Sequence, residues 1–228
     1  ASAVQKIIAG APQASPENAY LARKRVGVYS IYQTGDGRLI VPVIKDGAVV
    51  SAQYIEADGS KQYHGGGEVK GGYFPIGPLP PQGPLYIAEG YATAASIYEA
   101  TGCTTIAALS AGNIMPVAQW LRDKLGAVQD ITIVGDNDDT NTGQKAAKEA
   151  GTAIGARVLI PPDIGDANDY VNAGGDLKLL LTGRAPWLTQ ADEFCAKPSP
   201  IRWLVKKWIQ ADGLAMVFGD SGAGKTFI

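Results

Sequence analysis

The sequence Ile131-Thr132-Ile133-Val134-Gly135-Asp136-Asn137-Asp138-Asp139 joins a short apolar run to a cluster of carboxylates. The β-branched residues predict a buried strand, and the glycine permits a turn at its carboxyl end. In open α/β sheets ligands bind at that edge, and oxygen ligands packed this closely favour a divalent cation such as Mg²⁺. An alternative interpretation is a solvated Asp/Asn turn that caps the following helix.

Alternating strands and helices surround this stretch on both sides. Apolar runs of strand length separate longer segments with helical periodicity, which is typical of a mainly parallel sheet flanked by helices. We therefore predict an α/β catalytic domain over residues 81–183, with right-handed crossovers. The predicted strands are 85–88, 104–109, 131–134 and 157–160, and the predicted helices are 92–100, 117–125 and 143–154.

A different rhythm precedes this domain. Apolar residues recur at every second position in segments between Val26 and Ile55, separated by Gly-Asp-Gly and Asp-Gly turn signals, which predicts an antiparallel β meander. A short helix is expected over 17–24. Because the proline-rich segment 79–84 ends regular structure, residues 1–80 are predicted to form an N-terminal antiparallel α+β accessory lobe.

Composition narrows the class of protein. No run of eighteen apolar residues and no N-terminal apolar signal region occur in the 228 residues, so a cytoplasmic protein without a membrane span is expected. The two cysteines and one histidine cannot build a zinc finger, so any metal ion must be held by oxygen. A net charge of −2 argues against a protein that coats duplex DNA broadly.

Two more acidic segments follow predicted strands. Glu89 comes directly after the strand 85–88, and Asp166 and Asp169 follow the strand 157–160. Since the carboxyl ends of parallel strands meet at one edge, we expect these side chains to converge with Asp136 and Asp138. The sequence therefore predicts a Mg²⁺ site built by three strand ends.

These motifs resemble a Toprim domain, the metal-dependent fold shared by bacterial-type primases, topoisomerases and several nucleases. Glu89-Gly90, Asp136-Asn137-Asp138 and the segment 166–169 carry the resemblance, which covers residues 85–181. Residues 19–181 further resemble the Toprim primases of phages and plasmids, which are often fused to a helicase. The resemblance implies a DNA primase that joins nucleoside triphosphates into short primers on a single-stranded DNA template.

The resemblance also implies roles for individual residues. Asp136 and Asp138 would bind Mg²⁺ or Mn²⁺, and Glu89 would complete the metal site or move a proton at the 3′-hydroxyl. Asp166 and Asp169 would hold a second ion. The residues expected to contact template or nucleotide phosphates are Arg23, Lys24, Lys61 and Lys145, with solvated side chains as the alternative for all four.

A second motif lies at the end of the sequence. A linker is expected over 184–200, a short helix over 201–209 and a strand over 214–218. The segment 219–226 then fits the P-loop pattern G-x-x-x-x-G-K-[ST] and resembles the start of a RecA-like helicase ATPase over 201–228. Because no further motif follows, we expect a fragment of a longer primase-helicase with an inactive P-loop. The P-loop residues are Gly219, Gly224, Lys225 and Thr226.

Three other functions fit part of the pattern. A Toprim nuclease would use the same carboxylates to cleave phosphodiesters, and a non-catalytic docking module would serve the helicase without them. A phosphoacceptor receiver domain also places acids at strand ends, but it leaves the β lobe and the P-loop unexplained. A topoisomerase would need a further tyrosine-bearing domain.

Overall fold

The computed structural model describes residues 3–80, 83–127, 129–183, 203–205 and 209–210. Contacts divide the chain into two units, Ala1–Arg184 and Ala185–Ile228. In the second unit β10 (Trp203–Val205) and β11 (Ile209–Gln210) form an antiparallel pair. The predicted helix over 201–209 is therefore wrong, since aromatic and β-branched residues here favour a strand. The predicted linker over 184–200 and the predicted strand 214–218 lie outside the described residues.

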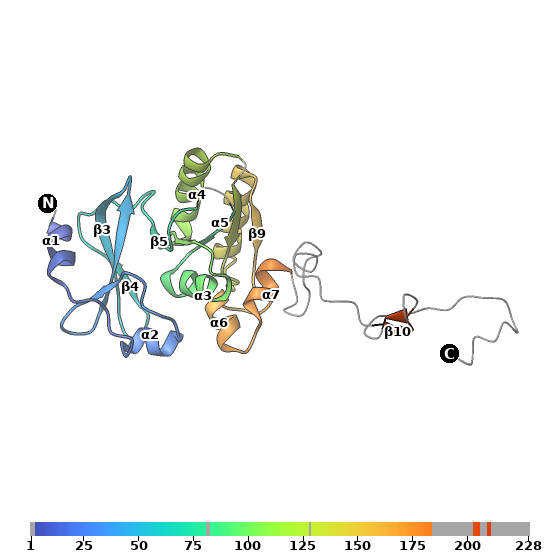
Figure 1. The fold of residues 1–228 in the computed structure, drawn as a ribbon. Coiled ribbons are helices and arrows are strands. Elements are labelled where there is room, and N and C mark those ends of the chain that lie inside the picture. Colours follow the sequence, from blue (N-terminus) through green and yellow to red (C-terminus); the bar gives the residue numbers. More distant parts are fainter. Residues whose placement is uncertain (1–2, 81–82, 128, 184–202, 206–208, 211–228) are drawn as a thin grey trace, which may run out of the picture. The chain divides into compact units, whose positions relative to one another are not determined.

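The first unit begins with the predicted β meander (Figure 1). Its four strands pair antiparallel in the order β1-β2-β3-β4, and the helix α1 (Ala3–Gly10) packs against β3. Alternate residues of β2 face opposite sides: Ile40 contacts the α1 side, whereas Val41 enters the main core. The strands are β1 (Tyr32–Gln33), β2 (Leu39–Lys45), β3 (Ala48–Ile55) and β4 (Lys61–Tyr63), and α2 is Ala19–Lys24.

The α/β part contains a second sheet with the order β5-β7-β6-β8-β9. Strands β6 to β9 run parallel, as predicted, while β5 pairs antiparallel with β7. The strands are β5 (Phe74–Ile76), β6 (Pro84–Ala88), β7 (Thr105–Ala107), β8 (Asp130–Val134) and β9 (Arg157–Leu159). Strand β5 precedes residue 80, yet it belongs to this sheet, so the backbone hydrogen bonds between β5 and β7 join the two predicted lobes. The boundary at residue 80 stays a prediction.

Helices cover both faces of this sheet (Figure 1). Those on one face, α3, α6 and α7, contact one another, and those on the other face, α4 and α5, form a pair. The helices are α3 (Tyr91–Thr101), α4 (Ala111–Leu125), α5 (Thr142–Ile154), α6 (Ala167–Asn172) and α7 (Leu177–Thr182). Helix α4 starts six residues before its predicted start at 117. Pro116 lies inside this helix, within the six residues that the prediction left out.

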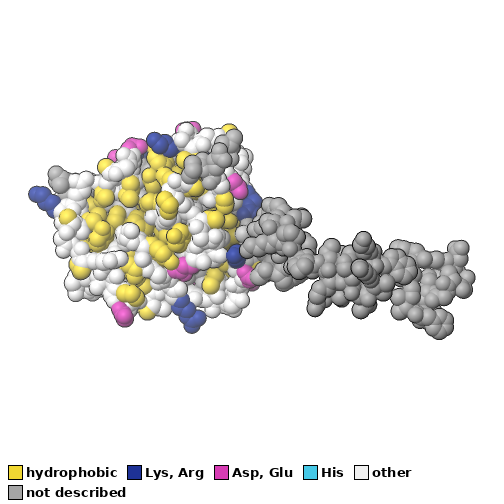
Figure 2. Space-filling model, viewed as in Figure 1, with side chains coloured by type: hydrophobic (Ala, Val, Ile, Leu, Met, Phe, Trp, Pro, Cys, Tyr) yellow, Lys and Arg dark blue, Asp and Glu magenta, His cyan; other side chains and the backbone are white. Residues whose placement is uncertain are grey.

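Two hydrophobic cores hold the parallel sheet in place. Tyr86 and Ala88 of β6 pack with α3 and with the β meander in one core, whereas Leu85 and Ile87 pack with α4 and α5 in the other. Strand β6 is therefore buried on both sides, as central parallel strands require. None of the described helices is long and apolar enough to cross a membrane. In the space-filling view, hydrophobic side chains occupy the middle of the face shown and basic ones lie scattered (Figure 2).

Candidate active site

The candidate site lies where β6 and β8 end side by side. These strands pair in parallel with Ala88 opposite Val134, but α3 follows β6 on one face and α5 follows β8 on the other. A crevice opens at such a switch point in a doubly wound sheet. Glu89 directly follows β6 and Asp136 lies two residues beyond β8, so the topology brings both to the same edge.

Asp136 is the most perturbed carboxylate of the site. Burial, together with the charges of Glu89 and Asp166, raises the pKa of Asp136 from 3.8 to about 7, although Lys61 opposes the shift. Its Oδ1 atom is buried and has no hydrogen-bond partner. A buried carboxylate oxygen without a donor is unfavourable, and a bound cation is one way to satisfy it.

Glu89 shares this environment. Burial raises the pKa of Glu89, while Lys61 and a backbone hydrogen bond from Ala111 act in the opposite direction. Lys61 projects from β4 of the meander, and a Cβ atom added to Gly90 would stand 3.0 Å from its Nζ atom. The glycine after Glu89 therefore leaves room for a cation of the accessory lobe beside the acids.

Asp138 has a different role in this structure. Its Oδ1 accepts the N–H of Thr142 at 3.0 Å, and its Oδ2 accepts that of Gly143 at 2.6 Å. A hydrogen bond from the Thr140 hydroxyl, together with these two backbone bonds, lowers the pKa of Asp138. The helix-capping alternative is thus realised by Asp138. A Cβ on Gly143 would lie 3.0 Å from Asp138 Oδ2, so this glycine permits the close approach.

Asn137, between the two aspartates, attaches the third acidic segment to the site. Its backbone exchanges two hydrogen bonds of 2.9 Å with Gly165, and its side-chain amide donates to the carbonyls of Pro161 and Asp163 at 3.0 Å. Asp166 follows this bridge directly, and its charge reaches Asp136 and Glu89. Sequence reasoning treated Asn137 only as the middle of a motif. No sequence signal pointed to this role, because the loop that Asn137 holds lies 24 to 26 residues further along the chain.

Replacing Asn137 with alanine is expected to destabilise the protein by about 2 kcal/mol, because the carbonyls of Pro161 and Asp163 lose their donor. Urea denaturation measures this difference. Asp139→Ala is the matched control, since Asp139 is exposed in the same turn. Equal unfolding free energies for the two variants would show that the amide does not hold the loop.

The predicted basic residues are spread over different environments. Arg23 donates to the carbonyl of Ala57 and lies over the ring of Tyr20, and it lines a surface pocket together with Asp169. Lys145 is exposed and forms only a loose i,i+4 ion pair with Glu149, at 3.9 Å. Lys24 pairs with Asp169 and Asp166, at 2.8 and 3.5 Å. The P-loop residues lie outside the described residues. Lys61 is thus the predicted cation whose charge acts on both Glu89 and Asp136.

No three Asp, Glu, His or Cys side chains within the described part of the chain are gathered closely enough to hold a metal ion. The hydrogen bonds above explain this, because Asp138 is turned toward α5 and the third segment toward Lys24. The unpartnered Oδ1 of Asp136 nevertheless fits an oxygen-liganded cation. A metal ion would therefore require neighbouring carboxylates to rotate toward Asp136.

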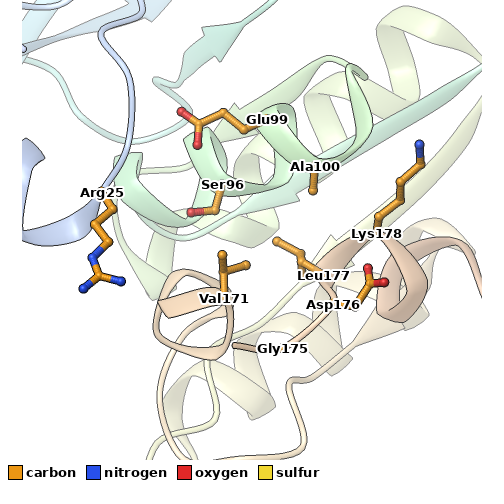
Figure 3. Close-up of a pocket in the computed structure, with 9 residues that line it drawn as sticks. All are labelled: Arg25, Ser96, Glu99, Ala100, Val171, Gly175, Asp176, Leu177 and Lys178. Atoms are coloured by element: carbon orange, nitrogen blue, oxygen red, sulfur yellow. The ribbon is translucent and has the colours of Figure 1, made fainter. Parts of the chain in front are cut away.

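A separate cavity of about 350 Å³ lies between α3 and the α6–α7 region (Figure 3). Apolar Val171 and Leu177 line it together with oppositely charged Arg25 and Glu99. None of the predicted site residues that the structure describes lines this cavity. Its lining residues are Arg25, Ser96, Glu99, Ala100, Val171, Gly175, Asp176, Leu177 and Lys178.

Comparison with known families agrees with the topology and the acidic edge. Residues 84–176 match the Toprim domain family. Proteins of this family are metal-dependent, and the acids at the strand ends described above fall within the matched residues. Residues 182–228 match the AAA domain family, in agreement with the expected start of a P-loop ATPase.

Two curated relatives are Escherichia coli proteins named DNA primase TraC. They are 34% identical to this chain over 139 and 126 residues, or 57% and 51% of its length. The matched parts amount to only 13% and 9% of the relatives' own lengths. The similarity therefore covers about half of this chain and only a small part of these relatives.

Solved primase structures share the fold. The primase fragment of the bacteriophage T7 primase-helicase protein has a TM-score of 0.56 at 17% identity, over 77% of this chain and 80% of that one. A DnaG primase catalytic domain bound to ssDNA has a TM-score of 0.54 at 13% identity, over 85% of each chain. The matches extend beyond the Toprim domain, so the β meander belongs to the shared architecture.

Proposed function

We propose that this chain is the catalytic core of a DNA primase, which joins nucleoside triphosphates into short primers on single-stranded DNA. The observation that carries the proposal is the buried, unpartnered carboxylate oxygen of Asp136 at the switch point of a Toprim sheet. Nucleotidyl transfer concentrates negative charge on a triphosphate, and a cation held by acidic residues is suited to neutralise it. The names of the TraC relatives support the same assignment.

The acidic residues divide the work in this proposal. Asp136 and Asp138 would hold a Mg²⁺ or Mn²⁺ ion, which when bound would stabilise charge on the phosphoryl oxygens. Glu89 lies beside them with a raised pKa, so it is suited to accept the proton of the attacking 3′-hydroxyl. Lys61 faces the same edge and would orient the incoming triphosphate through its ammonium group.

The remaining parts would serve replication. The accessory lobe supplies Lys61 and would flank the template, and the segment matching an AAA domain would lead into a helicase ATPase. Arg23 and Lys145 remain candidates for phosphate contacts, because both are exposed. The proposal assigns no activity to the P-loop of this chain.

The test is primer synthesis by the purified 228-residue chain. Single-stranded DNA, labelled NTPs and Mn²⁺ are incubated with the protein, and products are resolved on a denaturing gel. We expect labelled oligomers that require both template and metal. Shortened template without oligomers would instead indicate a Toprim nuclease. If neither labelled oligomers nor shortened template appear, the chain is a non-catalytic docking module.

A further inference from the structure

The third acidic segment is already neutralised by a lysine of the accessory lobe. Lys24 Nζ lies 2.8 Å from Asp169 Oδ1 and 3.5 Å from Asp166 Oδ2, and the Lys24 side chain is 20% exposed. Burial alone would lower the pKa of Lys24, but the hydrogen bond and charges of Asp169 and Asp166 outweigh it and raise that pKa. The lysine is therefore charged where a second metal ion was predicted.

The other oxygens of these two carboxylates are also occupied. Asp166 Oδ1 accepts the N–H of Asp169 at 2.8 Å, and Asp169 Oδ2 accepts the N–H of Asp166 at 3.2 Å, so the pair forms a capping box at the start of α6. With Lys24 on the remaining oxygens, all four have a donor. This contrasts with Asp136, whose buried Oδ1 has none.

The backbone of Lys24 is fixed against the same helix. Its carbonyl oxygen accepts hydrogen bonds from the side-chain amides of Asn168, at 2.7 Å, and Asn172, at 3.2 Å. Asn168 is 1% exposed and also donates to Ser96 of α3 at 2.9 Å. Because these two amides, of which Asn168 is buried, hold the end of α2 on α6, the ammonium group is fixed beside the acidic pair.

We infer that the Lys24 ammonium takes the place of a second metal ion at Asp166 and Asp169, so that the site binds one divalent cation, at Asp136. This inference rests on the proposed function and corrects its sequence-based form, in which Asp166 and Asp169 bind an ion. A divalent ion beside Lys24 would meet a like charge, and both carboxylates would have to give up their present donors. One fixed ammonium group replaces one exchangeable ion.

Counting bound Mn²⁺ tests the inference. Electron paramagnetic resonance of free Mn²⁺, titrated with the full chain with and without NTP, gives the stoichiometry without requiring catalysis. We expect one ion per wild-type chain, one in the double variant Asp166→Asn with Asp169→Asn, and none in Asp136→Asn. Lys24→Met is expected to gain a second, weaker ion, whereas Lys24→Arg keeps one.

Two ions in the wild-type chain, one of them lost in the double variant, would overturn the inference, and so would a Lys24→Met chain that folds and still binds one. Circular dichroism establishes whether each variant folds. If Lys24→Met does not fold, Lys24→Arg supplies the comparison. Primer synthesis with two bound ions would refute the lysine inference alone. One ion lost in Asp136→Asn without any primer synthesis would refute the primase proposal alone.

Discussion

Primer synthesis is expected to fall by about 10³-fold when Asp136 is replaced by asparagine, with little change in the affinity for template. Asparagine keeps the size of the side chain but removes the charge that would hold the cation. Because Asp136 lies at the switch point and is the described carboxylate with a buried, unpartnered oxygen, no neighbour is placed to replace it. Steady-state rates of oligomer formation at saturating NTP measure the loss.

Asp139→Asn is the matched control for this variant. Asp139 lies in the same turn, three residues beyond Asp136, but it is exposed. The same change of charge there should leave the rate within about twofold, since exposed surface charges interact weakly through water. Equal losses in the two variants would mean that the turn contributes only a general negative field, and a fully active Asp136→Asn protein would remove Asp136 from the mechanism.

The sequence was sufficient to predict the parallel sheet because its strands are buried on both faces. Ile131 and Ile133 enter one core and Val134 the other, so a short β-branched run had one compatible structure. The register of β6 on β8 then follows, and with it the shared edge for Glu89 and Asp136. The positions of Glu89 and Asp136 after their strands were enough to predict that they lie close together, because the carboxyl ends of adjacent parallel strands lie side by side.

The partners of the acids could not be predicted in the same way. Lys24 precedes Asp166 by 142 residues, and their contact depends on how α2 docks on α6. No local pattern encodes such a contact, so Lys24 was predicted to bind phosphate. Strand β5 was missed for a related reason, because three residues with a central proline do not resemble a strand until β7 supplies hydrogen bonds.

The raised pKa of Asp136 predicts a pH-dependent stability of the metal-free protein. The folded state holds the Asp136 proton up to a pH of about 7, whereas the group ordinarily releases it near 3.8. Between these values the folded state binds more protons than the unfolded state, so stability falls as pH rises and the full loss is present above pH 7. The shift corresponds to about 4 kcal/mol as an upper bound.

Thermal unfolding in chelator should therefore separate wild type from Asp136→Asn. At pH 8 the variant is expected to melt about 5 to 10 °C higher, because it has no charge to bury, and the difference should shrink toward pH 4. Adding Mn²⁺ at pH 8 should raise the melting temperature of the wild type and leave that of the variant nearly unchanged. Glu89, whose pKa burial also raises, contributes a pH dependence of the same sign in both proteins, and its repulsion with Asp136 is part of the expected difference. The wild type and Asp136→Asn could instead melt at the same temperature at pH 8, with or without Mn²⁺. In that case the buried charge of Asp136 does not destabilise the protein and binds no cation, and the metal site would have to lie elsewhere.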